Sequence, residues 1–341
     1  MQTTYEKVLS CLMGAALGDA MGAATEGKTI REIKEEYGGY VRELLPVKKG
    51  NRGEEIPLGT VTDDFSFAYA SLEILLREDG PITWEKARAC LMHWSKLERY
   101  RCFAGPTALA AIEYFKKNPR GQCPRGGLNY FNATNGAAMK GFIGGLFHPD
   151  DPQRICHDTF LLSAVTHPNS TGIAAACAVA CATAQALRTD AQLETVIQAG
   201  MDGAAIGNAI AVSEGMEIPG PSVEKRIALA VETAGQGTDW ESKMQNLADM
   251  VGSGLMAIES IPCAFGILVA CPGDVLSGIQ MGVNIGGDTD TVASMYGAVA
   301  GALYSIPRET EPLCELLEKA NDMRIRDMAN HVYRHMNAPD R

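Results

Sequence analysis

Two acidic clusters, far apart in the sequence, carry the residue types best suited to chemistry. Residues 62–64 read Thr-Asp-Asp, and residues 288–291 read Asp-Thr-Asp-Thr directly after the glycine pair Gly286 and Gly287. Each cluster runs into a stretch of small or apolar residues, a pattern typical of the first turn of a helix. Dense oxygen donors without cysteine or histidine suit a hard divalent cation rather than zinc. The sequence therefore predicts a metal-assisted enzyme.

The geometry of a helix start explains how such clusters can form one site. If Thr62 or Asp63 caps the helix, side chains of residues 62–64 fan around a turn whose free N–H groups favour carboxylates. A preceding glycine pair permits the backbone conformation that lets Asp288 and Asp290 converge. Two such turns would supply four carboxylates and two hydroxyls, whose mutual repulsion calls for one or two Mg²⁺ or Mn²⁺ ions. Each cluster alone could be an ordinary cap, but capping needs one oxygen per helix rather than three.

Helical periodicity dominates the rest of the chain, and Gly/Pro clusters separate the periodic stretches. A strand is indicated only weakly, at residues 41–47, and aromatic residues make up just 6% of the composition. No linker or internal repeat is evident, so we predict one all-α domain over residues 1–341. The expected helices cover Tyr5–Gly22, 65–77, 84–97, 107–117, 172–188, 193–211, 223–234, 241–250, 262–271, 274–283, 291–304 and 312–335.

The charge and composition of the chain exclude several classes of binding partner. The formal charge of −11 argues against a nucleic-acid or anionic-membrane surface. No stretch approaches the roughly 20 apolar residues of a membrane span, and the charged first 27 residues make a poor signal peptide. The ten cysteines form no C-x-x-C pair, and those in apolar helical runs are expected to be small core residues, namely Cys177, Cys181, Cys263 and Cys271. We expect a cytoplasmic protein with reduced thiols.

Six motifs occur in order along the chain. They are G-x-x-x-G-D-A-x-G-x-x-x-E at residues 14–26, T-D-D at 62–64, N-G-A-A-M at 135–139, T-H-P-N at 166–169, E-S-I-P at 259–262 and N-I-G-G-D-T-D-T at 284–291. In type and order they resemble those of the ADP-ribosylglycohydrolase family, which includes the ADP-ribosylhydrolases and the dinitrogenase-reductase-activating glycohydrolases. The resemblance extends over nearly the whole length and is more specific than any single motif.

The resemblance implies a compact orthogonal helical bundle around a binuclear Mg²⁺ centre, in which Mn²⁺ is also possible. It implies that Glu26 lies near the reacting ribose of an ADP-ribosyl group. It also implies that Asn135, Gly136 and Ala137 approach the diphosphate, and that His167 lies near the diphosphate or ribose. The implied metal ligands are Thr62, Asp63, Asp64, Asp288, Asp290 and Thr291.

We therefore expect a metal-dependent glycohydrolase that cleaves an N- or O-glycosidic bond to the ribose of an ADP-ribosyl conjugate. Such cleavage builds positive, oxocarbenium-like charge at the ribose. Glu26, or an uncoordinated oxygen of Asp63 or Asp64, would accept the proton of the attacking water.

Departures from the family pattern keep two alternatives open. Phe65 and Ser66 follow the first acidic cluster, where many relatives have a threonine next. Lys140 stands where many relatives carry arginine, and lysine cannot make the paired hydrogen bonds of a guanidinium. Residues 99–106 contain no aspartate to pair with the guanidinium of a substrate, which argues against ADP-ribosyl-arginine as the substrate. The alternatives are a hydrolase of a smaller N-riboside and a catalytically silent, metal-binding family member.

Overall fold

A computed structural model describes residues 3–49, 54–77, 80–122 and 132–338. In these ranges the structure is all-α apart from one antiparallel pair of short strands, β1 (Val47–Lys49) and β2 (Glu54–Ile56). The predicted fold class is confirmed. The strand expected at residues 41–47 is wrong except for its last residue. No helix within these ranges has both the length and the apolar character needed to cross a bilayer.

Helices fill most of the described chain. In order they are α1 (Tyr5–Gly22), α2 (Ile30–Tyr37), α3 (Asp63–Leu75), α4 (Trp84–Trp94), η1 (Glu98–Tyr100), α5 (Pro106–Lys117), η3 (Asn135–Leu146), α6 (Pro152–Ala164), α7 (Ser170–Ala186), α8 (Leu193–Glu214), α9 (Val223–Gln236), α10 (Trp240–Met250), α11 (Ala257–Ala270), α12 (Val275–Asn284), α13 (Thr289–Tyr304), η4 (Arg308–Thr310), α14 (Glu311–Asn321) and α15 (Ile325–Met336).

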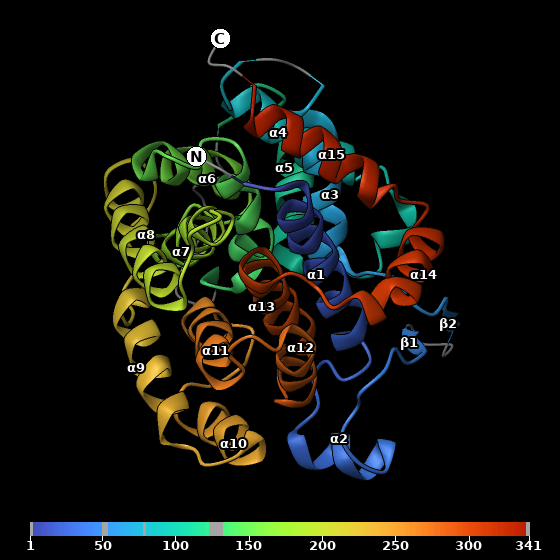
Figure 1. The fold of residues 1–341 in the computed structure, drawn as a ribbon. Helices are drawn as coiled ribbons and strands as arrows, with labels where there is room; N and C mark the ends of the chain where they lie inside the picture. The colour runs from blue at the N-terminus through green and yellow to red at the C-terminus, as the bar shows by residue number, and fades with distance from the viewer. Residues whose placement is uncertain (1–2, 50–53, 78–79, 123–131, 339–341) are drawn as a thin grey trace.

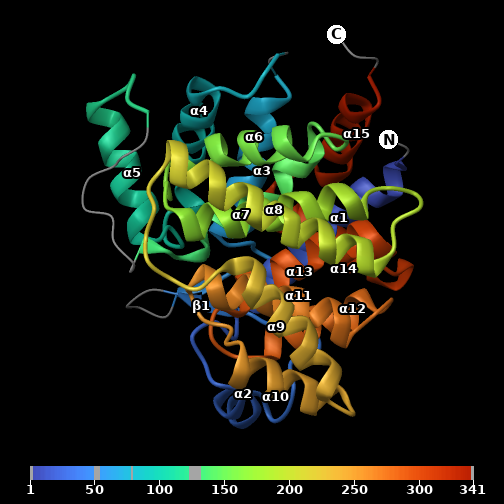
Figure 2. The same cartoon turned by 90° about the vertical axis from the view of Figure 1, so that its left-hand side faces the viewer.

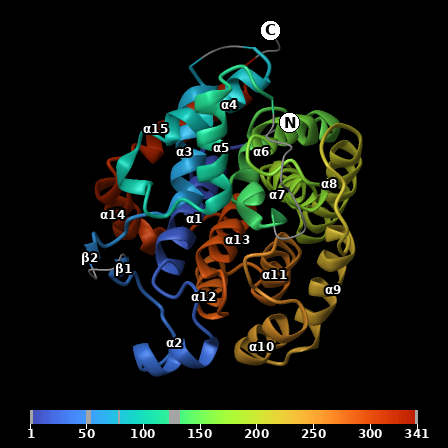
Figure 3. The ribbon, with the colours of Figure 1, turned by 180° about the vertical axis from the view of Figure 1, so that it is seen from behind.

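Helices α1 and α13 lie side by side at the centre, although they are far apart in the sequence (Figure 1). Helices α7 and α8 pack together on one side and α14 and α15 lie on the other, as the view from behind also shows (Figure 3). The turned view places α2 and α10 together at the lower end of the molecule (Figure 2). The two predicted acidic clusters are thus carried by helices at or beside the centre.

Glycines explain the close approach of α1 and α13. A Cβ added at Gly14 would lie 2.1 Å from the carbonyl oxygen of Gly297, and one at Gly22 would lie 2.4 Å from the Cα of Asp290. Side chains would therefore force the two backbones apart. Because the backbones touch along their length, the C-terminal end of α1 is held directly against the first turn of α13, where the second acidic cluster begins.

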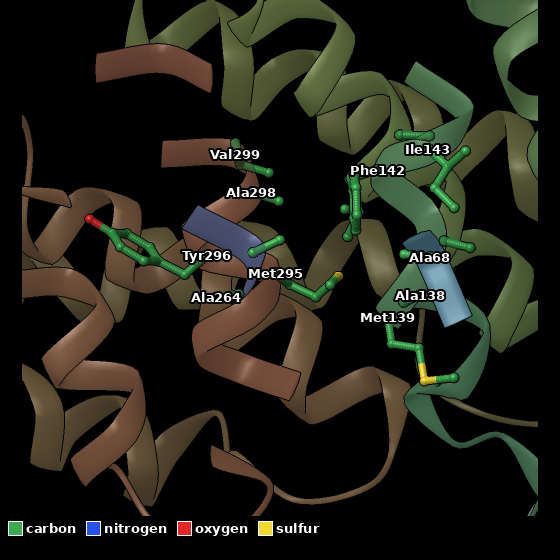
Figure 4. Packing of buried hydrophobic residues seen from close by; sticks show 14 of the residues in the cluster. Ala68, Ala138, Met139, Phe142, Ile143, Ala264, Met295, Tyr296, Ala298 and Val299 are labelled. Carbon is green, nitrogen blue, oxygen red and sulfur yellow. The ribbon is translucent and has the colours of Figure 1, made fainter. Parts of the chain in front are cut away.

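Small and apolar residues fill the space around this central pair. Almost every residue of α7 is buried, consistent with a sequence that is apolar all round. Met295 of α13 extends toward Phe142 of η3, so the core continues from the central pair to η3 (Figure 4). The four cysteines expected in the core, Cys177, Cys181, Cys263 and Cys271, are all buried with free thiols.

Two predicted helix boundaries are wrong for identifiable reasons. Helix α11 begins at Ala257, five residues before Pro262. Proline has no N–H to donate to the carbonyl of Ile258, one turn earlier. Nε of Arg226 donates to that carbonyl instead, at 3.1 Å, so the helix can extend before the proline. The helix expected over residues 312–335 is two helices, since Asp322 adopts a left-handed conformation with φ of 53° and ends α14. Five helical segments of the described chain were not predicted: α2, η1, η3, α6 and η4.

Candidate metal centre

The first acidic cluster lies at the start of α3, where Thr62 is the N-cap and its Oγ1 accepts from the backbone N–H of Asp64 at 3.3 Å. This agrees with the predicted cap. The buried carboxylate of Asp19 on α1 accepts from the N–H of Thr62 at 3.0 Å and from that of Phe65 at 2.9 Å. Asp19 therefore satisfies N–H groups at this helix start and fixes α3 against α1.

The second cluster lies at the start of α13, with Asp288 as the N-cap residue. Gly286 and Gly287 have φ of 82° and 74°, a left-handed conformation that favours glycine, as the sequence predicted. The N–H of Gly287 donates to the carbonyl of Lys28 at 2.9 Å, and the carbonyl of Gly287 accepts from Gly27 at 2.8 Å. The loop that carries the second cluster is therefore paired with the loop that follows α1.

The structure brings the two clusters together. Single carboxylate oxygens of Asp19, Asp64 and Asp290 all lie within 4.8 Å of one another. The same holds for Glu26, Asp288 and Asp290, so Asp290 belongs to both groups. Asp290 and Asp64 are buried, whereas Glu26 is exposed at the edge. The arrangement has two adjoining oxygen-rich positions that share one carboxylate.

The remaining members of the predicted ligand set lie in the same helix turns. Thr62 and Thr291 are buried. Burial raises the pKa of Asp64, and a hydrogen bond from the side chain of Thr291 partly offsets this rise. Asp63 follows Thr62 in the first turn of α3 and is half-buried. Its oxygens belong to neither of the two carboxylate groups described above.

Electrostatics favour a cation at these positions. Burial, and then repulsion from Asp288 and Asp64, raises the pKa of Asp290 well above its usual range. Burial and the nearby Asp19 likewise raise the pKa of Asp64. Oδ2 of Asp64 is buried and has no hydrogen-bond partner among the residues that the structure describes. A buried carboxylate oxygen without a donor is costly, and a divalent cation would satisfy it.

The segment of residues 135–137 lies against this acidic cluster. Nδ2 of Asn135 donates to Oδ2 of Asp288 at 2.5 Å and to Oγ of Ser260 at 3.1 Å. Asn135 therefore contacts a predicted metal ligand in this structure. The next residue, Gly136, lies against the ring of His167, since a Cβ there would be 2.6 Å from Cε1. Asn135 thus contacts the cluster directly, and Gly136 and His167 contact each other one residue further on, with Ala137 following in η3.

His167 is buried and held by two hydroxyls. Its Nδ1 is hydrogen-bonded with Oγ1 of Thr166 and its Nε2 with Oγ1 of Thr134, each at 2.9 Å. Burial, and then the charge of Lys140, lowers the pKa of His167 to about 3. The imidazole is therefore neutral at physiological pH and is suited to positioning rather than to carrying charge.

Lys140 and Asp19 belong to the site neighbourhood but were not predicted as site residues. Nζ of Lys140 donates to the carbonyl of Gly136 at 2.8 Å and lies 4.9 Å from the ring centroid of Phe67. Burial lowers the pKa of Lys140 to about 7, against the opposing effect of Asp63 and Asp64. The sequence signal for Lys140 was the exchange with arginine, and for Asp19 it was the Gly-Asp pair inside a helix.

Ser66 does not replace the threonine that many relatives carry after the first cluster. Its Oγ accepts from Nε1 of Trp94 at 2.9 Å, and the residue is fully buried. The hydroxyl therefore fixes α4 against α3. Phe65, at the position of the missing threonine, is also fully buried.

Fold and site together define an all-helical protein with converging carboxylates at the starts of two helices. A family model described as ADP-ribosylglycohydrolase matches residues 1–341, so the chain belongs to the ADP-ribosylglycohydrolase family. Membership of this family implies a hydrolase, and the carboxylates brought together here are of the kind that could hold a metal ion.

Similar proteins extend over nearly the same length. The uncharacterised protein YegU of Escherichia coli (strain K12) is 28% identical over 323 residues, which cover 93% of each chain. The human ADP-ribosylhydrolase ARH3 is 25% identical over 340 residues, covering 91% of this chain and 90% of its own. A solved chain of an ADP-ribosylglycohydrolase-related protein complex has a TM-score of 0.68 at 21% identity, covering 97% of this chain and 98% of its own. This likeness shows the fold.

Proposed function

We propose that the protein is a metal-dependent glycohydrolase that cleaves an N- or O-glycosidic bond to the ribose of an ADP-ribosyl conjugate. The observation that carries the proposal is the convergence of Asp19, Asp64 and Asp290 with Glu26 and Asp288 in two adjoining groups of oxygens. Capping two helices does not require so many buried carboxylates, and their mutual repulsion needs a cation to offset it.

The proposed ligands are the two threonines and four aspartates of the helix starts. Mg²⁺ or Mn²⁺ held there would supply positive charge that neutralises the carboxylates and attracts ribose hydroxyls. Asp290 would contribute to both positions, because it belongs to both oxygen groups. Asp19 would hold α3 in place through its two backbone contacts. The proposed ligands are Thr62, Asp63, Asp64, Asp288, Asp290 and Thr291.

Hydrolysis breaks the bond from ribose C1 to the nitrogen or oxygen of the leaving group, and the bonding electron pair goes to that atom. The oxygen of water forms the new bond to C1, water loses one proton, and the leaving atom gains one. Glu26 is the proposed base that accepts the proton, because it is exposed and one of its oxygens lies within 4.8 Å of the Asp288 and Asp290 oxygens. Asp63 and Asp64 are the alternative bases.

The position of residues 135–137 next to the carboxylates supports an ADP-ribosyl group as the part of the substrate that the protein recognises. Gly136 and Ala137 bring backbone close to the cluster, and backbone N–H groups in such turns bind phosphate oxygens. His167, neutral and held by Thr134 and Thr166, would orient that segment. A single domain and a cytoplasmic location remain part of the proposal.

A smaller N-riboside is the second candidate substrate, and one observation favours it. The side-chain amide of Asn135 donates to Asp288 and Ser260, and its backbone N–H donates to the carbonyl of Leu255. Two polar groups of the proposed diphosphate segment therefore have partners within the protein. A substrate without a diphosphate would leave these contacts intact.

A substrate panel tests the proposal. Purified protein is incubated with Mg²⁺ or with EDTA, together with serine- and arginine-linked ADP-ribosyl conjugates, acetylated ADP-ribose and simple N-ribosides. We expect Mg²⁺-dependent release of ADP-ribose, strongly reduced in Glu26→Gln, which keeps the shape of the side chain. Release from N-ribosides alone would favour the second candidate. Mg²⁺ binding without turnover of any substrate would indicate a catalytically silent family member.

A further inference from the structure

A groove next to the proposed centre is lined in part by the two paired loops that follow α1 and precede α13. Its volume is about 680 Å³, and α2, α10 and residues 285–287 contribute to its lining. Gly27 and Gly287, which line it, directly follow Glu26 and precede Asp288 in the sequence. The lower end of Figure 2 shows α2 and α10 side by side. The groove is therefore continuous with the loops that carry the proposed base and a proposed metal ligand.

The lining is positively charged in a protein that is otherwise acidic. Three cations line the groove, Lys28, Arg31 and Lys34, against a single carboxylate, Asp249. The chain as a whole carries a formal charge of −11. All three cations line one groove, so an anionic ligand seated there can contact them together.

The ion pairs that these three cations form within the protein are exposed, so a ligand in the groove can compete for them. Lys28 is 3.4 Å from Glu36 and Lys34 is 3.7 Å from Glu241, and neither glutamate lines the groove. Nε of Arg31 is 3.9 Å from Glu35, which also does not line the groove, and the Arg31 side chain is 83% exposed. Exposed ion pairs of this kind are weak and exchange readily for a partner bound in the groove.

The groove and the proposed diphosphate segment involve different elements. Residues 135–137 are on η3 and His167 precedes α7, and none of them lines the groove. An ADP-ribosyl group bound along η3 would end with its ribose at the carboxylates. The leaving group, attached to C1 of that ribose, would then extend past Glu26 toward α2 and α10.

We propose that this groove binds the leaving-group side of the substrate, and that its ligand is an acidic peptide segment next to the ADP-ribosylated residue. The inference rests on the proposed function and adds a substrate class to it. Cations of α2 would contact aspartate or glutamate side chains of the peptide. Free peptide and ADP-ribose, the two products, would then bind at the same time.

Peptide binding tests this inference directly. A fluorescent peptide rich in Asp and Glu is titrated at low salt into the Mg²⁺-loaded protein with saturating ADP-ribose, and a matched Asn/Gln peptide serves as the neutral probe. Arg31→Gln/Lys34→Gln removes two groove cations. Lys225→Gln/Arg324→Gln removes two exposed cations elsewhere, with side chains 75% and 83% exposed.

We expect the acidic peptide to bind more tightly than the neutral one, and about fivefold more weakly to Arg31→Gln/Lys34→Gln. The control variant should match the wild type, and added salt should remove the difference. Equal binding of the two peptides, unchanged binding to the groove variant, or competition between peptide and ADP-ribose would overturn the inference. ADP-ribose that fails to bind while the peptide binds as expected would contradict the proposed function and not the groove.

Discussion

The side-chain amide of Asn135 donates a 2.5 Å hydrogen bond to Oδ2 of Asp288, across 153 positions of sequence. This contact joins the segment proposed to bind diphosphate to a proposed metal ligand. A second contact also holds the N-G-A-A-M segment in place, because the backbone N–H of Asn135 donates to the carbonyl of Leu255 at 3.0 Å. Substrate binding and metal binding are therefore expected to be linked.

Replacing Asn135 by alanine should lower both the stability of the protein and its affinity for ADP-ribose. Loss of a hydrogen bond to a buried carboxylate should cost about 2 kcal/mol of unfolding free energy, because Asp288 loses a donor. ADP-ribose affinity should fall in the same variant. Chemical denaturation and calorimetry measure the two effects, and Asn208→Ala, at an exposed position on α8, is the control. Wild-type stability and affinity in Asn135→Ala would show that the contact has no role.

Asp290→Asn should stabilise the metal-free protein and abolish tight Mg²⁺ binding. The folded-state pKa of Asp290 is raised, so its ionised form destabilises the fold, and this penalty develops as pH rises above about 4. Asparagine cannot ionise and avoids the penalty. Denaturant unfolding at pH 8 should therefore show a more stable metal-free variant, and Mg²⁺ should stabilise the wild type more than the variant. Unchanged Mg²⁺ affinity would refute the ligand assignment.

Two glycine substitutions should have opposite effects on stability. A Cβ at Gly297 would lie 2.1 Å from the carbonyl of Gly14, so Gly297→Ala should cost about 3 kcal/mol by forcing α13 from α1. Gly235 in α9 has nothing within 4 Å of such a Cβ, and Gly235→Ala should stabilise the protein by up to about 1 kcal/mol. Thermal unfolding compares them. Equal effects would contradict the backbone contact.

Asp158 on α6 should give the protein a pH dependence away from the centre. Burial raises its pKa to about 6, above the unfolded value, so its contribution is most favourable at low pH and is lost as pH rises from about 4 to about 6. Nε2 of His148 lies 3.5 Å from its Oδ2 and would oppose part of this loss when protonated. Asp158→Asn should flatten the stability profile over this range. A profile identical to that of the wild type would show that Asp158 titrates normally.

Sequence reasoning predicted the helix starts well because their signals are local. Thr62 caps α3, and the positive φ angles of Gly286 and Gly287 shape the loop before Asp288. Helix boundaries failed where distant residues decide them. Arg226 supplies the donor that allows α11 to extend before Pro262, and no local pattern contains that information. Helix α2 was missed because only Ile33 of its eight residues is buried.

The environment of the site could be predicted less completely than its ligands. Carboxylates in a short motif are visible in the sequence, but their partners come from other elements. Asp19 reaches the start of α3 because α1 packs against α3, and Lys140 lies over the ring of Phe67 because η3 packs against α3. Such contacts depend on packing between helices, which the sequence does not specify by spacing alone.

The central claim is that metal and an ADP-ribosyl group share one site. Calorimetric titration of Mg²⁺ into metal-stripped protein, with and without ADP-ribose, tests it most directly. The account predicts that ADP-ribose strengthens Mg²⁺ binding, and that Asp290→Asn removes this binding without unfolding the protein. Mg²⁺ binding that is indifferent to ADP-ribose, or an absence of Mg²⁺ binding to the wild type, would contradict it.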